Sequence, residues 1–294
     1  MQIIPGQIKT AALQGYLQGA VAPRPICFAS TVDKDGTPNL SPFSFFNIFG
    51  SNPVTLIFSP ARRVRDNTTK HTLENILETK EVVINVVNYA MVQQASLSSC
   101  EYPKGVNEFE KSGFTPVAAE KVKPFRVKES PVQFECVVKE VLEQGTEGGA
   151  GNLIICEAVM IHINDNILNE AGNIDPHKID LVARMGGDYY CRASGGAVFE
   201  VAKPNTSLGI GIDALPSSIR QSRILTGNNL GQLANVHEQP VIDPAFEDEH
   251  LKNIFQYYSI TPDEMEKELH LHAQQLLENG KVQEAWQVLL AGAQ

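Results

Sequence analysis

The sequence predicts a mainly β protein with flanking helices, built as an antiparallel barrel and followed by a helical C-terminal extension. Short apolar runs with strand character recur up to Ile163 and are joined by short turns. Only one or two helical patterns lie among these runs, which favours an antiparallel arrangement over a βαβ sheet. After about residue 200 the composition changes, and the last fifty residues have helical periodicity.

The elements of the β region can be placed in order along the chain. A helical pattern covers residues 8–18, and Pro23 and Pro25 then impose an extended backbone. Strands are expected over 26–32, 38–46, 54–58, 81–87, 132–142 and 152–163. Asp33 to Gly36 is typical of a turn between the first two strands, and the last two strands should pair in a long hairpin.

Helices are expected at three further places. One covers 66–80, with Asp66 or Asn67 as its N-cap. Residues 90–126 contain several Pro and Gly residues and are expected to form a short helix and a long covering loop. Thr261 to Glu264 has a capping-box pattern, and apolar stripes on both sides of Gly280 predict a two-helix hairpin.

Composition excludes several classes of function. The 294-residue chain has a formal net charge of −10, and an acidic surface repels phosphate backbones and anionic lipid heads. We therefore expect neither nucleic acid nor a membrane as partner.

The sequence also lacks a signal-peptide pattern and a long apolar span, so a cytoplasmic protein is expected. The five cysteines and seven histidines show no disulfide or metal-binding spacing, and no metal site is expected.

A cluster of arginines is the first candidate for a binding site. Arg62, Arg63 and Arg65 directly precede the helix expected over 66–80. Guanidinium groups beside a helix N-terminus suit a phosphate monoester. The alternative interpretation is a solvated basic loop with an ordinary helix cap.

The segment 39–47 is the second candidate. Ser41, Ser44 and Asn47 lie there among apolar side chains, and polar groups next to a core need partners. A flavin supplies such partners through its ring carbonyls, ring nitrogens and ribityl hydroxyls, around an apolar body. The alternative is an edge strand with exposed serines.

Three other signals have plainer interpretations. The glycine-rich run 145–151 precedes a strand and lacks the lysine of a P-loop, so a flexible hairpin connection is the better interpretation. A role near a cofactor is conceivable for His162, but a hydrogen-bonded core or surface histidine is favoured. No serine lies in a G-x-S-x-G pattern, so nothing supports a hydrolase.

The chain resembles the flavin reductase-like proteins with an FMN-binding split barrel, particularly the flavoredoxin branch, over roughly residues 8–200. The matching stretches are Pro23-Arg24-Pro25-Ile26, Ser30-Thr31-Val32-Asp33, Asn39-Leu40-Ser41-Pro42-Phe43-Ser44, Asn52-Pro53, Arg65-Asp66-Asn67-Thr68, Glu81-Val82-Val83-Ile84-Asn85-Val86, Tyr102-Pro103-Lys104-Gly105 and Arg184-Met185-Gly186-Gly187-Asp188-Tyr189-Tyr190. The family often has Lys-Asp-Thr before the helix, whereas this chain has Arg65-Asp66-Asn67.

The resemblance implies a split-barrel domain over 1–200, an extension over 201–294 without an assigned role, and a homodimer with FMN near its interface. By positional match, the flavin site would be lined by Ser30, Thr31, Ser41, Pro42, Phe43, Ser44, Asn47, Ser59, Pro60, Ala61, Arg62, Arg65, Asn67 and Thr68. NADH or NADPH would be the transient hydride donor, and a small molecule or a protein would accept the electrons. No catalytic acid or base is named.

Two other functions stay open. The same motifs would serve a flavoredoxin-like electron carrier whose FMN is reduced by a partner protein. A non-enzymatic binding module, in which the helical extension recruits a partner, is the third interpretation.

Overall fold

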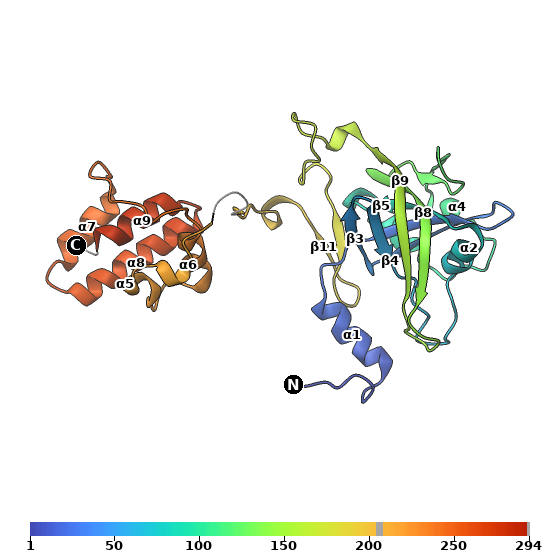
Figure 1. Ribbon diagram of the computed structural model, residues 1–294, viewed down its shortest axis with the longest axis horizontal. Coiled ribbons are helices and arrows are strands. Elements are labelled where there is room, and N and C mark those ends of the chain that lie inside the picture. The colour runs from blue at the N-terminus through green and yellow to red at the C-terminus, as the bar shows by residue number, and fades with distance from the viewer. Residues whose placement is uncertain (204–207, 293–294) are drawn as a thin grey trace. The chain divides into compact units, whose positions relative to one another are not determined.

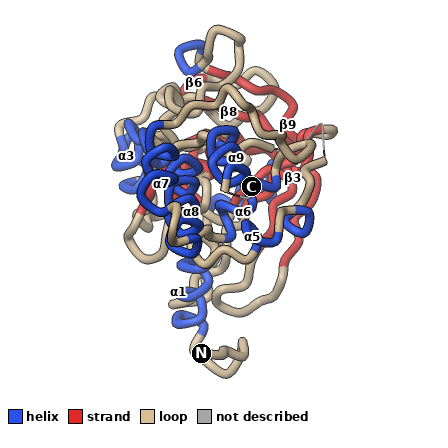
Figure 2. The backbone as a smooth tube through the Cα atoms, turned by 90° about the vertical axis from the view of Figure 1, so that its left-hand side faces the viewer, coloured by secondary structure: helices blue, strands red, loops and turns tan. Residues whose placement is uncertain are grey.

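The structure is a computed structural model that describes residues 1–203 and 208–292. The chain divides into two compact units, Met1–Phe199 and Glu200–Gln294. Within the described residues every strand belongs to the first unit, and the second contains the helices α5 to α9 (Figures 1 and 2).

A seven-stranded antiparallel sheet forms the first unit, in the order β2-β1-β5-β8-β9-β4-β3. The strands are β1 (Cys27–Val32), β2 (Pro38–Phe43), β3 (Phe46–Ser51), β4 (Val54–Phe58), β5 (Glu81–Val86), β8 (Val132–Glu143) and β9 (Asn152–Ile163). The order has two ends, at β2 and β3, so hydrogen bonds between the described strands do not close the sheet into the expected barrel.

The strand expected over 38–46 is wrong, because two strands lie there. β2 ends at Phe43, the chain bends at Ser44 and Phe45, and β3 begins at Phe46. β3 pairs with β4 at the opposite end of the sheet. The run stays rich in apolar residues through the bend, with Phe43 before it and Phe45 and Phe46 after it, so the local sequence does not reveal the break.

The other expected strands and both expected hairpins are confirmed. At the β1–β2 turn, Asp33 Oδ1 accepts the backbone N–H groups of Asp35 (3.0 Å) and Thr37 (2.8 Å), and Gly36 has a φ of 86°. The left-handed backbone at this position favours glycine. β8 and β9 form the long hairpin that dominates one side of the unit in Figure 1.

The helices of the first unit are α1 (Thr10–Ala20), α2 (His71–Thr79), α3 (Val92–Leu97) and α4 (Glu108–Ser112), with one-turn 3₁₀ helices at Tyr89–Met91, Asp165–Ile167 and Gly195–Ala197. Two small ribbons accompany them, β6 (Pro116–Val117) with β7 (Arg126–Val127), and β10 (Val182–Arg184) with β11 (Tyr190–Arg192). The segment 90–126 therefore contains the expected short helix together with a second helix and a ribbon.

α2 begins later than the sequence predicts. Lys70 is its N-cap residue, without a side-chain capping bond. Asp66 instead stabilises a preceding turn, because its Oδ1 accepts the Thr68 hydroxyl (2.6 Å) and the Thr68 N–H (3.1 Å). Asn67 has a φ of 58°, a left-handed conformation that asparagine tolerates and that interrupts a helix.

Helices cover both faces of the sheet near β1. Cys27 and Ala29 belong to the core cluster that also contains Leu73 and Ile76 of α2. The alternate residue Phe28 points to the other face and packs with α3 and α4. Cys27, Cys136 and Cys156 are fully buried in the first of these clusters, as small core residues should be. Burial raises the pKa of the Cys156 thiol to about 12.

The second unit contains more helices than the predicted hairpin. Its elements are a 3₁₀ turn (Ile212–Ala214), α5 (Ser217–Arg220), α6 (Gly227–Ala234), α7 (Glu249–Tyr258), α8 (Pro262–Glu278) and α9 (Val282–Ala291). α8 and α9 form the expected hairpin around Gly280. The capping box expected at Thr261 is wrong, since its side chain makes no cap bond, whereas Thr226 and Asn229 form one at α6.

Trp286 is fully buried at the centre of this unit, and its Nε1–H donates to the Leu233 carbonyl (3.2 Å). Across residues 1–203 and 208–292, no helix combines the length and apolar character needed to cross a bilayer.

Candidate functional site

Two neighbouring cavities in the first unit form the candidate site. The first has a volume of about 230 Å³ and lies between α3, the bend after β2 and the β10–β11 ribbon. Its lining is Ile26, Pro42, Phe43, Ser44, Val92, Ala95, Ser96, Ser99, Arg184 and Tyr190. Apolar side chains, three serines and a single guanidinium group therefore surround it.

The second cavity has a volume of about 500 Å³ and lies over the turn before α2. Its lining is Arg62, Arg63, Asp66, Thr68, Thr69, His71, Glu74, Glu101, Tyr102 and Pro103. Guanidinium groups and threonine hydroxyls here meet three carboxylates.

The two cavities are close together. Ser99 lines the first and Glu101 the second. Two residues of chain span at most about 7 Å, so the segment after α3 borders both cavities. The linings of the two cavities therefore adjoin at residues 99–101.

The wall of the first cavity is held by two arginines on neighbouring backbone segments. Arg24 and Arg184 form an antiparallel bridge through their backbones. The buried Arg24 guanidinium donates to the carbonyls of Met185 (2.6 Å), Val21 (2.5 Å) and Gln18. Burial, and secondarily the charge of Arg184, lowers the pKa of Arg24.

Arg184 in turn orients the aromatic part of this wall. Its guanidinium carbon lies 4.6 Å from the centre of the Tyr190 ring, and its Nη2 donates to the Gly187 carbonyl (2.6 Å). A cation over an aromatic face stabilises this arrangement.

The opposite wall, α3, is tied to the sheet through α4. Gln94 of α3 donates from Nε2 to the carbonyl of Ser112 (2.9 Å). Glu108 of α4 accepts the backbone N–H of Leu40 on β2 (3.0 Å) and is only 5% exposed. Burial raises the pKa of the Glu108 carboxyl.

The arginines of the second cavity are held by groups of the chain itself. Arg62 donates from Nε to Asn67 Oδ1 (2.7 Å) and from Nη2 to the Asn67 carbonyl (2.8 Å). Arg63 donates from Nη1 to Thr68 Oγ1 (2.8 Å) and from Nε to Glu101 Oε1 (3.1 Å). Arg65 is largely exposed and also reaches Glu101.

The charges shift the pKa values of nearby groups. A hydrogen bond from Arg65 lowers the pKa of Glu101. Burial, and then the charge of Arg63, lowers the pKa of Lys70. The region therefore favours anions, a preference that its own carboxylates partly satisfy.

The glycine-rich loop 145–151 packs against the arginine segment. Gly149 N–H donates to the Arg62 carbonyl (3.0 Å), Arg62 N–H donates to the Ala150 carbonyl (2.9 Å), and Asn67 Nδ2 donates to the Thr146 carbonyl (2.9 Å). The loop is a hairpin connection between β8 and β9, as expected, and these bonds attach it to the second cavity.

The structure brings some of the predicted site residues together. Pro42, Phe43 and Ser44 line the first cavity, and Arg62 and Thr68 line the second. Arg65 and Asn67 lie beside the second cavity and bond to its lining.

Ser59, Pro60 and Ala61 connect β4 to the segment of Arg62. Asn152 at the start of β9 donates from its backbone N–H to Ser59 Oγ (3.1 Å) and from Nδ2 to the Pro60 carbonyl (2.9 Å). These residues position the arginine segment and line neither cavity.

The remaining predicted residues also lie outside the two linings. Ser30 and Thr31 are fully buried in β1; Thr31 Oγ1 accepts Asn75 Nδ2 (3.1 Å), and Ser30 Oγ has no partner among the described residues. Ser41 lies on β2 opposite Ala29. Asn47 is exposed on β3, and its Oδ1 accepts the N–H of Ile48 (2.8 Å).

Sequence reasoning missed several lining residues. Val92 and Ser96 lie on α3 and Ser99 lies in the turn just after it, inside the segment expected to form a short helix and a covering loop. Arg184 and Tyr190 belong to the closing motif of the resemblance, but were not assigned to the site. Ser96 and Ser99 are three positions apart, a spacing typical of side chains on one side of a helical turn, and this signal was available in the sequence.

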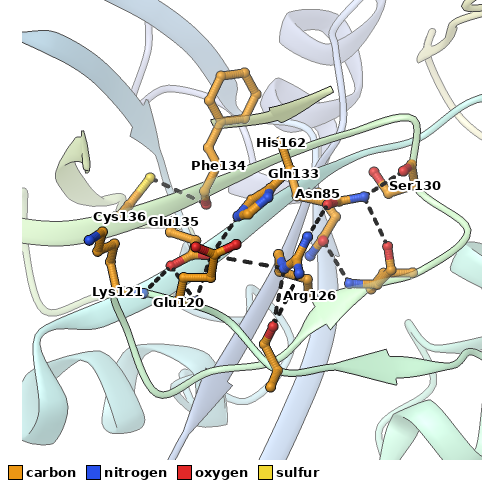
Figure 3. A network of polar contacts seen from close by, with 12 residues as sticks. Asn85, Glu120, Lys121, Arg126, Ser130, Gln133, Phe134, Glu135, Cys136 and His162 are labelled. Carbon is orange, nitrogen blue, oxygen red and sulfur yellow. Dashed lines mark hydrogen bonds and ion pairs between the residues drawn. The ribbon is translucent and has the colours of Figure 1, made fainter. Parts of the chain in front are cut away.

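His162 belongs to a separate polar network on the sheet (Figure 3). Its Nε2 lies 2.7 Å from Oε1 of the fully buried Glu135. Glu135 also accepts the backbone N–H groups of Glu120 (2.9 Å) and Lys121 (2.6 Å), and Arg126 lies 3.9 Å away. The favoured interpretation, a hydrogen-bonded histidine, is confirmed. In the described part of the chain, no group of three or more potential metal ligands is found.

Comparison with known proteins identifies the family. The family described as "Flavin reductase like domain" matches residues 20–179, more than half of the chain. The chain therefore belongs to the flavin reductase-like family.

Individual proteins of known sequence or structure are also similar to this chain. An uncharacterised protein of Aquifex aeolicus is 38% identical over 195 residues, which is 66% of this chain and 97% of that protein. Nitrilotriacetate monooxygenase component B from Bacillus cereus has a TM-score of 0.63 at 27% identity, covering 68% of this chain and 98% of its own. A putative flavin reductase with a split-barrel domain from Shewanella frigidimarina scores 0.58 at 27% identity, with 69% and 100% covered.

Flavoredoxin of Desulfovibrio vulgaris shares the fold, with a TM-score of 0.53 at 22% identity, and 70% of this chain and 98% of that chain are covered. Each of these proteins is spanned almost completely, so residues beyond the shared domain account for the greater length of this chain.

Proposed function

We propose that the chain is an FMN-binding flavoprotein that acts as an NAD(P)H-dependent oxidoreductase of the flavin reductase type. The observation that carries the proposal is the pair of adjoining cavities, one apolar with serines and one rich in arginine and threonine. Family membership supports the same assignment.

The lining residues fit FMN. Serine hydroxyls and apolar side chains suit an isoalloxazine ring with polar edges, and the Arg184–Tyr190 pair offers a flat wall. Arg63 and Thr68 offer the charge-assisted and hydroxyl donors that a phosphate monoester accepts. The segment 99–101 borders both cavities and would accompany the ribityl chain.

The chain's own residues have positioning roles in this proposal. The Arg24 bonds hold the wall of the first cavity, Glu108 holds α4 against β2, and Gln94 ties α3 to α4. Bound FMN would supply hydride acceptance from NADH or NADPH and onward electron transfer, and the protein would supply orientation and exclusion of water. The electron acceptor would be a small molecule or a protein.

A flavin titration tests the proposal directly. The purified protein should be yellow or should quench FMN fluorescence on reconstitution, and anaerobic NADH or NADPH should bleach the flavin band. Arg63→Gln should weaken FMN binding by about 10- to 100-fold, the value of a lost charge-assisted bond, and should leave riboflavin binding unchanged. Lys139→Gln, which removes an equal charge from the exposed side of β8, is the matched control. A protein that binds no flavin would end the proposal.

An electron carrier is the second candidate function. Tyr189 is 77% exposed beside the cavity-lining Tyr190, and an exposed aromatic side chain at the cavity edge suits a docking protein. In that case neither nicotinamide would reduce the bound flavin, whereas a reductase or ferredoxin partner would reduce it rapidly.

A homodimer is proposed as the working form. β3 is an end strand of the sheet and exposes Ile48 (58%) and Phe49 (64%). Exposed apolar side chains on an edge strand favour pairing with a second chain. Light scattering after size exclusion should give twice the 32.2 kDa chain mass, and Phe49→Lys should shift the mass toward the monomer. A wild-type protein that is monomeric at micromolar concentration would contradict the proposal.

A further inference from the structure

Glu101 occupies the donors on which the proposed phosphate site depends. Its Oε1 accepts Arg63 Nε (3.1 Å), and its Oε2 accepts Arg65 Nη2 (2.7 Å). Both carboxylate oxygens are therefore engaged by guanidinium groups, inside the cavity that Glu101 itself lines.

A carboxylate and a phosphate compete for such donors, because a guanidinium fork binds either one. The Nη1 group of Arg63 is already directed to Thr68 Oγ1 and the Thr69 carbonyl. The Nε–H group, which donates to Glu101, is therefore a principal donor that Arg63 can redirect to an incoming anion. A phosphate that arrived while Glu101 stayed in place would also meet its negative charge.

The side chain of Glu101 can give way at small cost. It is 46% exposed, and exposed ion pairs contribute little because water and salt screen them. Asp66, the other nearby partner of Arg65, differs because its Oδ1 accepts both the hydroxyl and the N–H of Thr68 and maintains the turn.

We propose that Glu101 is an internal competitor for the flavin phosphate. It holds Arg63 and Arg65 in place in the flavin-free chain, and it determines how strongly the site distinguishes FMN from a flavin without a phosphate. This inference rests on the proposed function, since it assigns the phosphate to the second cavity.

The test compares FMN and riboflavin binding by fluorescence quenching in wild type and Glu101→Gln. The substitution keeps the size of the side chain and removes its charge. The dissociation constant for FMN should fall about three- to tenfold, because two exposed ion pairs no longer compete. The constant for riboflavin should not change. Glu101→Ala repeats the test, and thermal unfolding verifies that each variant folds.

Two variants distinguish competition by Glu101 for the arginines from a general effect of negative charge in the cavity. Glu101→Asp keeps the charge on a shorter side chain and should tighten FMN binding less than Glu101→Gln. Glu74→Gln removes a charge from the same cavity, but that carboxylate bonds to Thr69 Oγ1 (3.0 Å) and Lys104 Nζ (3.4 Å) instead of the arginines. Its effect on FMN should therefore be the smaller one.

The outcomes discriminate between the two proposals. The competitor role would be overturned if Glu74→Gln tightened FMN binding as much as Glu101→Gln does. It would also be overturned if Glu101→Gln tightened riboflavin binding as much as FMN binding. Unchanged or weaker FMN binding in Glu101→Gln would overturn it as well, while the proposed function would stand if wild type binds FMN. Wild type that binds neither flavin would refute the proposed function itself.

Discussion

Gly148→Ala tests whether the glycine-rich loop supports the second cavity. Gly148 does not have the left-handed φ that favours glycine, so an alanine there meets no backbone strain of its own. Its Cβ would lie 3.0 Å from the Arg63 carbonyl oxygen and 3.1 Å from that of Val64. Both contacts are with backbone atoms, which cannot rotate away as a flexible side chain would.

The cost follows from that geometry. Relief requires the loop and the arginine segment to separate by a few tenths of an ångström, and forced repacking of this kind costs about 1–3 kcal/mol. For a unit of this size, the midpoint of thermal unfolding falls by roughly 2–4 °C per kcal/mol. FMN affinity should fall in parallel, because Arg63 belongs to the displaced segment.

The chain provides separate probes for its two units. All five cysteines lie in the first unit, and the single tryptophan, Trp286, lies in the second. Labelling of the buried thiols during unfolding therefore reports on the first unit, and tryptophan fluorescence reports on the second. Gly148→Ala should shift only the thiol transition.

Gly196→Ala is the matched control, because a Cβ there meets nothing within 4 Å and the backbone φ is not left-handed. If Gly148→Ala matched this control in both unfolding midpoint and FMN affinity, the reasoning from the loop contact would be refuted.

Three further predictions concern the rest of the molecule. Glu135→Gln places an amide NH₂ among donors in a fully buried network. The free energy of unfolding of the first unit, measured in urea by thiol labelling, should therefore fall by about 2–4 kcal/mol. A loss below about 0.5 kcal/mol would contradict this expectation. Trp286→Ala should lower the free energy of unfolding of the second unit, followed by circular dichroism, by about 3–5 kcal/mol. The labelling of the buried cysteines in the first unit should not change. If both unfolding transitions shifted together, the two cores would not be independent. Hydrogen bonds from Thr68, and then Arg65, lower the pKa of Asp66 from 3.8 to about 2. The stabilising contribution of Asp66 should therefore be complete above about pH 4 and disappear as the pH falls toward about 2. The difference in unfolding midpoint between wild type and Asp66→Asn should vanish over that range, and a constant difference would refute the assignment.

Local patterns predicted most of the elements. The alternation over β8 and β9, the Asp33 turn and the apolar stripes around Gly280 each depend on residues within a few positions of one another, and each element formed. Failures occurred where local signals are ambiguous. The apolar-rich run continued through the bend at Ser44, and Asp66 capped a turn where the sequence indicated a helix start.

The candidate site was predictable only in part for the same reason. Arg62 and Thr68 face one cavity because they belong to one local segment, and Pro42 and Ser44 face another because both lie at the end of β2. Asn47 failed to join them, since the bend starts a new strand there on which its side chain is exposed and its Oδ1 accepts the N–H of Ile48.

By itself, the sequence determined the kinds of chemistry available: arginines and hydroxyls for an anion, serines within apolar strands for a flat polar ring, and an extension with its own helical periodicity. Only the tertiary structure decided which groups meet. Arg184 and Pro42 line the same cavity, and Glu101 meets arginines 36 and 38 positions earlier in the chain. Such meetings depend on strand order and on how α3 packs against the sheet, and neither leaves a periodic trace in the sequence.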